Sequence, residues 1–144
     1  MNTQKVIVGG LAAGVVTNVI DFIANGFILQ GTFKAAMDKL NPALSANMMN
    51  AGTLVGTVII DFVLGLLVVW TYAAIRPRFG PGAKTAVYAG LLIWLAGGTA
   101  WALLTVLGLF TWGVFFAGAI EALISVVAGA YVGAMLYKEE PQPA

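Results

Sequence analysis

Long apolar runs separated by short polar stretches set the pattern of this chain. Each run exceeds the roughly 20 apolar residues that a helix needs to cross a bilayer, and they cover residues 6–29, 51–75, 86–108 and 113–137. The last two runs join into one apolar stretch, residues 86–137, which as a single helix would be more than twice as long as the roughly 30 Å hydrocarbon core is thick. It must fold back, and residues 108–113 are the predicted turn. We predict an all-α, polytopic membrane protein whose residues 1–144 form one domain of four transmembrane helices.

The composition predicts the same class of protein. Hydrophobic residues make up 60% of the chain and charged residues 9%, whereas charged residues make up about a quarter of a soluble domain. The first apolar run is about twice as long as the apolar core of a signal peptide, and no small-residue cleavage site follows it. We therefore expect this run to be a retained helix.

Residue types that the chain lacks exclude several kinds of chemistry. Without Cys there are no disulfides, thiolate metal sites or iron–sulfur clusters. Without His the chain lacks the commonest metal ligand and general base. No nucleophile motif surrounds Ser45 or Ser125, so we expect neither an enzyme nor a cofactor or metal site. The net charge of +1 comes with scattered basic residues, which gives no basis for nucleic-acid binding.

The basic residues predict an orientation in the membrane. One side of the predicted bundle carries Lys5, Arg76, Arg78, Lys84 and Lys138, and the other carries Lys34 and Lys39. Under the positive-inside rule, both termini and the middle loop lie in the cytoplasm. Since Pro fixes φ and interrupts helices, we expect the middle loop, residues 76–84, to be a rigid turn.

The one long connection, residues 30–50, would lie on the outer side. Apolar residues recur in it at helical spacing, at Phe33, Ala36, Met37 and Leu40. This predicts a short amphipathic helix on the outer membrane surface that ends before Pro42. The segment either simply covers the bundle or forms a docking surface with Met48 and Met49 as adaptable apolar contacts.

Pairs of glycines four residues apart occur in three of the four runs: Gly10 and Gly14, Gly52 and Gly56, Gly129 and Gly133. Small residues at this spacing let helix backbones approach closely inside a membrane. They predict packing within one bundle or between subunits. Residues 15–22 also match residues 55–62 at five of eight positions. An inverted repeat of this kind is familiar in transporters, although it also occurs where nothing is transported.

Three acids, Asp21, Asp61 and Glu121, lie inside apolar runs that contain no basic residue. Intramembrane acids are costly and mark functional sites by default. Each lies eight or nine residues from the outer end of its predicted helix, which at about 1.5 Å per residue is a common depth of about 12–14 Å. We therefore predict one polar layer across the bundle.

Helical spacing gives these acids polar neighbours. Thr17, Asn18, Asp21 and Asn25 share one helix face, and Thr57 lies four residues before Asp61. The layer has three interpretations. It could be a hydrogen-bonded clasp that fixes helix register, a proton or cation path, or a polar contact with a partner subunit or a bound small molecule.

Two stretches resemble a known family. Residues 70–86, Trp-Thr-Tyr-Ala-Ala-Ile-Arg-Pro-Arg-Phe-Gly-Pro-Gly-Ala-Lys-Thr-Ala, look like the central signature of a family of small, uncharacterised bacterial four-helix inner-membrane proteins. Residues 10–14, with Asp21-Phe22 and Asn25-Gly26, are similar to the first helix of that family, in which Glu can replace Asp21. The resemblance implies a location in the bacterial inner membrane and brings no site residues with it.

We expect a non-catalytic accessory subunit of a larger inner-membrane complex, in contact with lipid and with other membrane subunits or copies of itself. Small size, short polar connections, small-residue helix faces and the lack of cofactor ligands favour this class. The alternative is a small oligomeric transporter or channel that uses Asp21, Asp61 and Glu121 as a proton or cation site.

Overall fold

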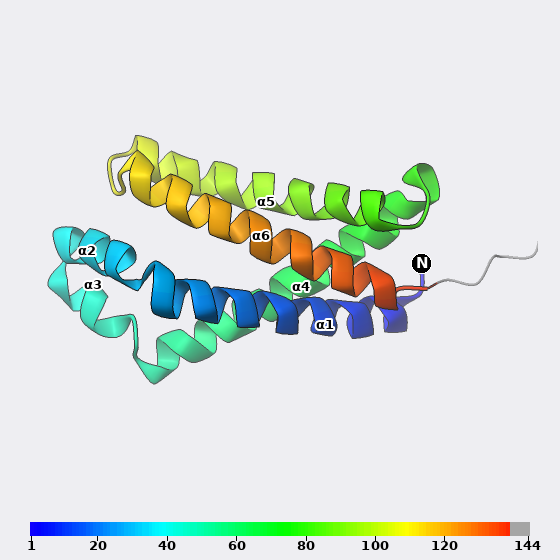
Figure 1. Cartoon of the computed structure of the whole chain (residues 1–144), viewed down its shortest axis with the longest axis horizontal. Helices are drawn as coiled ribbons and strands as arrows, with labels where there is room; N and C mark the ends of the chain where they lie inside the picture. The colour runs from blue at the N-terminus through cyan, green and yellow to red at the C-terminus, as the bar shows by residue number, and fades with distance from the viewer. Residues whose placement is uncertain (139–144) are drawn as a thin grey trace, which may run out of the picture.

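The computed structural model describes residues 1–138, and this part of the chain is helical, with turns and no strand. In chain order the helices are α1 (Thr3–Ile23), a π-helical turn (Ala24–Ile28), α2 (Gln30–Leu40), α3 (Pro42–Asn47), α4 (Ala51–Phe79), α5 (Ala83–Val106) and α6 (Trp112–Leu136) (Figure 1). Four segments are long and apolar enough to cross a membrane: Thr3–Ile28, Ala51–Phe79, Ala83–Val106 and Trp112–Leu136. The prediction of an all-α chain with four such helices is confirmed.

The turns between the long helices lie at glycines in the left-handed region of φ. Gly80 and Gly82, with φ of 82° and 121°, separate α4 from α5, and Gly108, with φ of 84°, follows α5. The last turn, residues 107–111, overlaps the predicted residues 108–113. The prediction that residues 76–84 form one rigid turn is wrong, because α4 continues through Pro77 and ends at Phe79. Pro77 lies in the last turn of α4, so it removes only one hydrogen bond near the helix end.

The connection between α1 and α4 contains two short helices rather than one. As predicted, α2 ends before Pro42, and α3 then begins at Pro42 with Asn41 as its N-cap, where the Asn41 side chain accepts from the Ala43 amide at 2.9 Å. Asp38 ties the two together, because it accepts from the Ser45 hydroxyl and pairs with Lys34 at 2.9 Å. These two interactions, the Ser45 hydrogen bond first, hold the pKa of Asp38 below its usual value.

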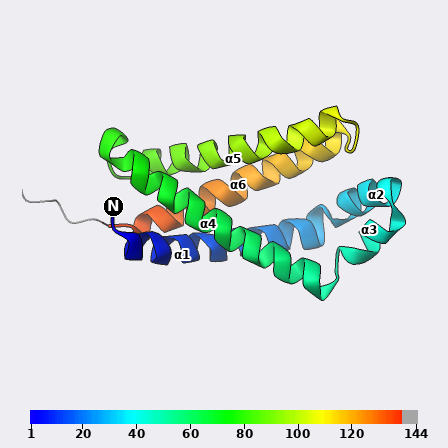
Figure 2. The same ribbon diagram turned by 180° about the vertical axis from the view of Figure 1, so that it is seen from behind.

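The four long helices run up and down between two ends of the molecule. The N-terminus, the α4–α5 turn and the end of α6 lie at one end, and α2, α3 and the α5–α6 turn lie at the other (Figures 1 and 2). α5 and α6 lie side by side, whereas α4 crosses the others obliquely. The first half of α4 therefore diverges from α5 and α6, and it crosses α1 obliquely.

Close backbone approaches hold α1 against α4 and α6. A Cβ added at Gly65 of α4 would lie 2.4 Å from both the carbonyl oxygen of Gly10 and the amide nitrogen of Gly14, closer than real Cβ atoms come. On the other side, a Cβ at Gly133 of α6 would lie 2.8 Å from the carbonyl oxygen of Gly9. One at Gly129 would lie 2.8 Å from Thr17 Oγ1. Two of the three glycine pairs thus lie at helix–helix contacts in this bundle.

The third pair, Gly52 and Gly56, lies against no other helix among residues 1–138. A Cβ added at Gly56 would meet no atom within 4 Å, and one at Gly52 would meet only the side-chain oxygen of its neighbour Asn50. Apart from half-buried Gly56, every residue from 51 to 60 is exposed. This pair therefore does not pack within the bundle. The other predicted role, contact with another subunit, remains a prediction.

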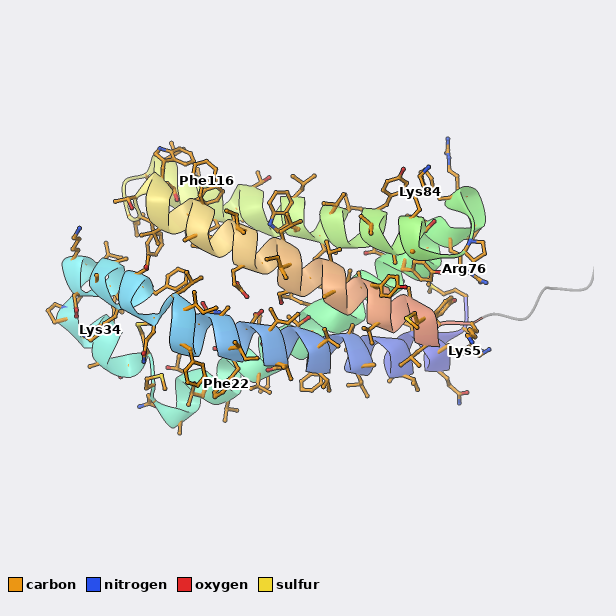
Figure 3. All side chains as sticks on the ribbon, in the orientation of Figure 1. Lys5, Phe22, Lys34, Arg76, Lys84 and Phe116 are labelled. Atoms are coloured by element: carbon orange, nitrogen blue, oxygen red, sulfur yellow. The ribbon has the colours of Figure 1, made fainter. Side chains whose placement is uncertain are left out.

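The basic residues separate as the sequence pattern indicates. Lys5, Arg76 and Lys84 lie at the end that holds the N-terminus, and Lys34 lies at the opposite end (Figure 3). Lys138 belongs to the first group, because its carbonyl oxygen accepts from Lys5 Nζ. Large apolar side chains such as Phe22 and Phe116 are exposed between the two ends, with 63% and 56% of their surface accessible. An apolar outer surface of this kind suits a lipid environment.

Candidate functional site

The first carboxyl of the candidate site lies beside an irregularity in α1. Asp21 is two residues from the end of the α-helical part, and the chain then widens into the π-helical turn Ala24–Ile28. The Leu29 amide donates to the Ala24 carbonyl oxygen at 2.7 Å, which is the five-residue spacing of a π-helix. Such turns occur frequently at functional sites, and they change which face the following residues present. The half-buried Asp21 thus lies directly before a local change of helix period.

The other two carboxyls come from α4 and α6 and meet Asp21. The Asp21 carboxyl lies within hydrogen-bonding reach of both Asp61 and Glu121. Asp61 and Glu121 are also close enough to each other to interact electrostatically. Three acids that are 40 and 60 residues apart in the sequence therefore form one cluster, with Asp21 shared between the two others. We refer to Asp21, Asp61 and Glu121 as the carboxyl cluster.

The three carboxyls differ in their access to the surroundings. Asp61 is buried, with 3% of its surface accessible, whereas Asp21 and Glu121 are half-buried. Each has one carboxyl oxygen that is fully buried and accepts no hydrogen bond from protein N–H or O–H groups: Oδ1 of Asp21, Oδ2 of Asp61 and Oε1 of Glu121. The cluster therefore has hydrogen-bonding capacity that the rest of the described chain does not use.

Hydrogen bonds among the three carboxyls need shared protons. Two carboxylates cannot hydrogen-bond to each other unless one of them carries a proton, and adjacent like charges at low dielectric repel strongly. The basic side chains lie near the ends of the helices and not at this level, and none in the described chain is seen to pair with these acids. Shared protons, rather than a Lys or Arg, are what can compensate the acids. Residues 1–138 contain no group of three or more acidic residues arranged to hold a metal ion.

Two of the four predicted polar neighbours lie in the packed interface of α1. Thr17 is buried and donates to the Ala13 carbonyl oxygen at 3.0 Å. Asn18 donates to the carbonyl oxygens of Gly14 at 2.9 Å and of Val58 at 3.4 Å, so it links α1 to the α4 backbone. Both therefore stabilise the helix contacts from which Asp21 projects one turn later.

The other two predicted neighbours, Asn25 and Thr57, are not brought into the cluster. Asn25 falls in the π-helical turn, where the helical spacing that predicted its position no longer applies. Thr57 is exposed and donates to the Thr53 carbonyl oxygen at 3.0 Å, within its own helix. Neither makes a hydrogen bond to the three acids in the described structure.

Ser125, which the sequence pattern did not place in the polar layer, belongs to the same interior region. Its side chain is 1% accessible, and its hydroxyl has no hydrogen-bond partner within the described residues. Ser125 lies midway between Glu121 and Gly129, one turn from each, and Gly129 packs on Thr17 of α1. The spacing of four residues from Glu121 was the signal that could have identified it.

Aromatic side chains cover the cluster towards the α2 end. Trp101 of α5 packs on Gly118, where a Cβ would lie 2.1 Å from the indole, and Gly118 precedes Glu121 by three residues. The Trp101 ring centroid lies 5.5 Å from that of Phe115 and 6.2 Å from that of Phe33 of α2. Trp94 donates from Nε1 to the Ala119 carbonyl oxygen at 2.8 Å and so fixes α5 on α6.

These features define a helical bundle of the membrane-protein class with an internal carboxyl cluster. No family model, curated protein or solved structure matches this chain. The cluster must therefore be interpreted from its own geometry.

The cluster gives a prediction for the free energy of unfolding. If it is a proton-sharing clasp, Asp61→Asn should unfold like the unmodified protein, because Asn keeps a donor and an acceptor of similar shape. Asp61→Leu should lose about 1–2 kcal/mol, since it leaves the other carboxyls without this partner. The measurement is thermal melting in detergent, with and without added sodium, and Glu140→Gln, outside the described residues, controls for the change in net charge.

An ion-binding cluster would give a different result. Asp61→Asn would then be the more damaging change, because it removes the charge that holds the cation. The unmodified protein would melt at a higher temperature in sodium, and Asp61→Asn would lose that shift. This pattern would rule out the clasp.

Proposed function

We propose that this protein is a non-catalytic accessory subunit of a larger assembly in the bacterial inner membrane. The observation that carries the proposal is the first half of α4, which the rest of its own bundle leaves uncovered. Residues 51–60 combine exposed apolar side chains with the unoccupied pair Gly52 and Gly56 and the exposed Thr53 and Thr57. Small residues and hydroxyls on one helix favour contact with another membrane helix.

The remaining chemistry agrees with a subunit rather than an enzyme. The polar groups inside the bundle are the carboxyl cluster, hydroxyls and amides, a set without the histidine and cysteine that serve most often as bases, nucleophiles and metal ligands. Small polar side chains in a helical bundle fix register and partner choice. The likeness of residues 70–86 to small bacterial membrane proteins supports the location.

The proposed orientation has both termini and the α4–α5 turn in the cytoplasm, with α2 and α3 outside. Its support is the gathering of Lys5, Arg76, Lys84 and Lys138 at one end of the molecule. Cys introduced at Ala43 should react with a membrane-impermeant thiol reagent in intact cells, and Cys at Ala83 should react only after the cells are opened. The reverse pattern would overturn the orientation.

The association surface is tested by adding bulk to α4. Gly56→Leu should leave the fold intact, because a side chain at Gly56 enters open space. It should also abolish stable association with other membrane subunits, since the backbone can no longer approach closely. The measurement is purification from native membranes in mild detergent, followed by mass spectrometry of the subunits present in stoichiometric amounts.

Gly97→Leu is the matched control for this experiment. Gly97 also lies in the interior of a long helix with no atom within 4 Å of an added Cβ, but on α5. Gly97→Leu should retain the associated subunits. A lone monomer or a homo-oligomer of the unmodified protein would contradict the proposal.

A second candidate, a small proton-coupled transporter or channel, is favoured by the carboxyl cluster. The half-buried Asp21 lies within hydrogen-bonding reach of both the buried Asp61 and the half-buried Glu121, an arrangement that could pass a proton between the interior and the lipid or water outside it. In this case the cluster would be a working site and not only a clasp.

Reconstitution in liposomes with an internal pH-sensitive dye separates the two candidates. Transport predicts a dye response to an imposed pH gradient that disappears in Asp61→Asn and persists in Asp38→Asn. An accessory subunit predicts no response from any of these preparations. A folded protein, checked by its thermal melting, that passes no protons would exclude the transporter.

A further inference from the structure

An open pocket, separate from the carboxyl cluster, lies at the end of the molecule opposite α2 and α3. The pocket has a volume of about 430 Å³, and its walls include Tyr72, Arg76, Tyr137 and Lys138. Binding sites for small molecules usually have volumes of about 300–1,000 Å³. This pocket therefore has room for a ligand headgroup.

The charge around this pocket is positive. Arg76 and Lys138 line it, and Lys5 is held beside it through its hydrogen bond to the Lys138 carbonyl oxygen. The same end of the chain also carries Arg78 and Lys84, so it has five basic residues. Two acids, Glu139 and Glu140, follow Lys138 in the sequence and lie outside the described residues. The basic residues of this end therefore outnumber the acids by three. The pocket therefore favours an anion.

Two buried tyrosines form the inner wall of the pocket. Tyr72 and Tyr137 are each 2% accessible, and their rings meet edge to face at 5.9 Å. The Tyr72 hydroxyl accepts from the Gly82 amide at 3.1 Å, which leaves its own O–H as a donor towards the pocket that it lines. The Arg76 guanidinium lies 5.8 Å from the centre of the Tyr137 ring, so the two side chains form a cation–π contact. Cations and a buried hydroxyl donor together suit a phosphate.

A smaller cavity of about 110 Å³ continues this pocket between the helices. It shares Tyr72, Gly82, Ala134 and Met135 with the larger pocket and is otherwise lined by Ala83, Ala86 and Tyr131. Its lining is largely apolar and comes from α4, α5 and α6, three of the helices that could cross a membrane. An anion with an apolar tail would fill both cavities, whereas a free inorganic ion would use only one.

We propose that the two cavities bind an anionic phospholipid, with the phosphate at Arg76, Lys138 and Tyr72 and the start of an acyl chain between Ala83 and Tyr131. Charge complementarity selects the anionic headgroup, and the continuous apolar cavity selects a lipid over free phosphate. Basic pockets between membrane helices bind lipid headgroups in this way.

The proposal is tested by measuring lipid binding to the full chain in neutral detergent by native mass spectrometry. Phosphatidylglycerol should bind more tightly than phosphatidylcholine with the same acyl chains. Arg76→Gln and Lys138→Gln should each weaken phosphatidylglycerol binding about fivefold. Ala83→Leu should weaken it without any change of charge, because the added side chain fills the apolar cavity.

Arg78→Gln is the matched control, since it removes the same charge from the same helix end but does not line either cavity. It should change the affinity by less than about twofold.

Equal losses in Arg78→Gln and Arg76→Gln would show a general surface attraction and overturn the proposal. Equal binding of both lipids would also overturn it. Displacement of the lipid by inorganic phosphate, together with unchanged binding in Ala83→Leu, would assign the site to a free phosphate instead. Since Lys138 is exposed, Lys138→Gln keeps the test valid if Arg76→Gln does not fold.

Discussion

The structure depends on the close approach of α1 to two other helices at once. Lipid offers no hydrophobic force that drives one apolar helix against another, so packing at short distance must stabilise the bundle. Glycines supply that distance on both sides of α1, at Gly65 of α4 and at Gly129 and Gly133 of α6. The position of these contacts along the helices then determines which side chains meet in the following turns. One turn after Thr17, the three backbones are still near enough for short acidic side chains to reach one another.

The carboxyl cluster is therefore a result of packing as well as a chemical feature. Asp21 stands between Asp61 and Glu121 because α1 stands between α4 and α6. No basic side chain of the described residues pairs with the three carboxyls, so hydrogen bonds among them need protons. Protons can leave or arrive, whereas a buried salt bridge cannot change its partners so easily. The same arrangement could thus serve as a clasp in one assembly and as a proton site in another.

Much of this fold could be predicted from periodicity and composition. The four apolar runs gave the four long helices, and the depth of the three acids indicated that they lie at one level. The features that escaped prediction each break a regular rule. The π-helical turn changes the helix period after Asp21, so the face of Asn25 was misjudged. Pro77 is accommodated near the end of α4, so a proline that normally ends a helix did not end this one. The spacing of Gly52 and Gly56 could be recognised in the sequence. The sequence alone could not show that the part of α4 that contains them diverges from the neighbouring helices.

The length of α4 agrees with that divergence. With 29 residues at about 1.5 Å per residue, α4 measures about 43 Å, against about 30 Å of hydrocarbon in a typical bilayer. A helix of this length must tilt or extend into the headgroups, and α4 lies obliquely to the other long helices. Its middle is fixed at Gly65 by the glycine contact with α1, so the tilt displaces the first half away from α5 and α6. When the protein lies in a bilayer, hydrophobic matching acts on the free end of α4, so the thickness of the bilayer bears on how far that end stands from the rest of the bundle.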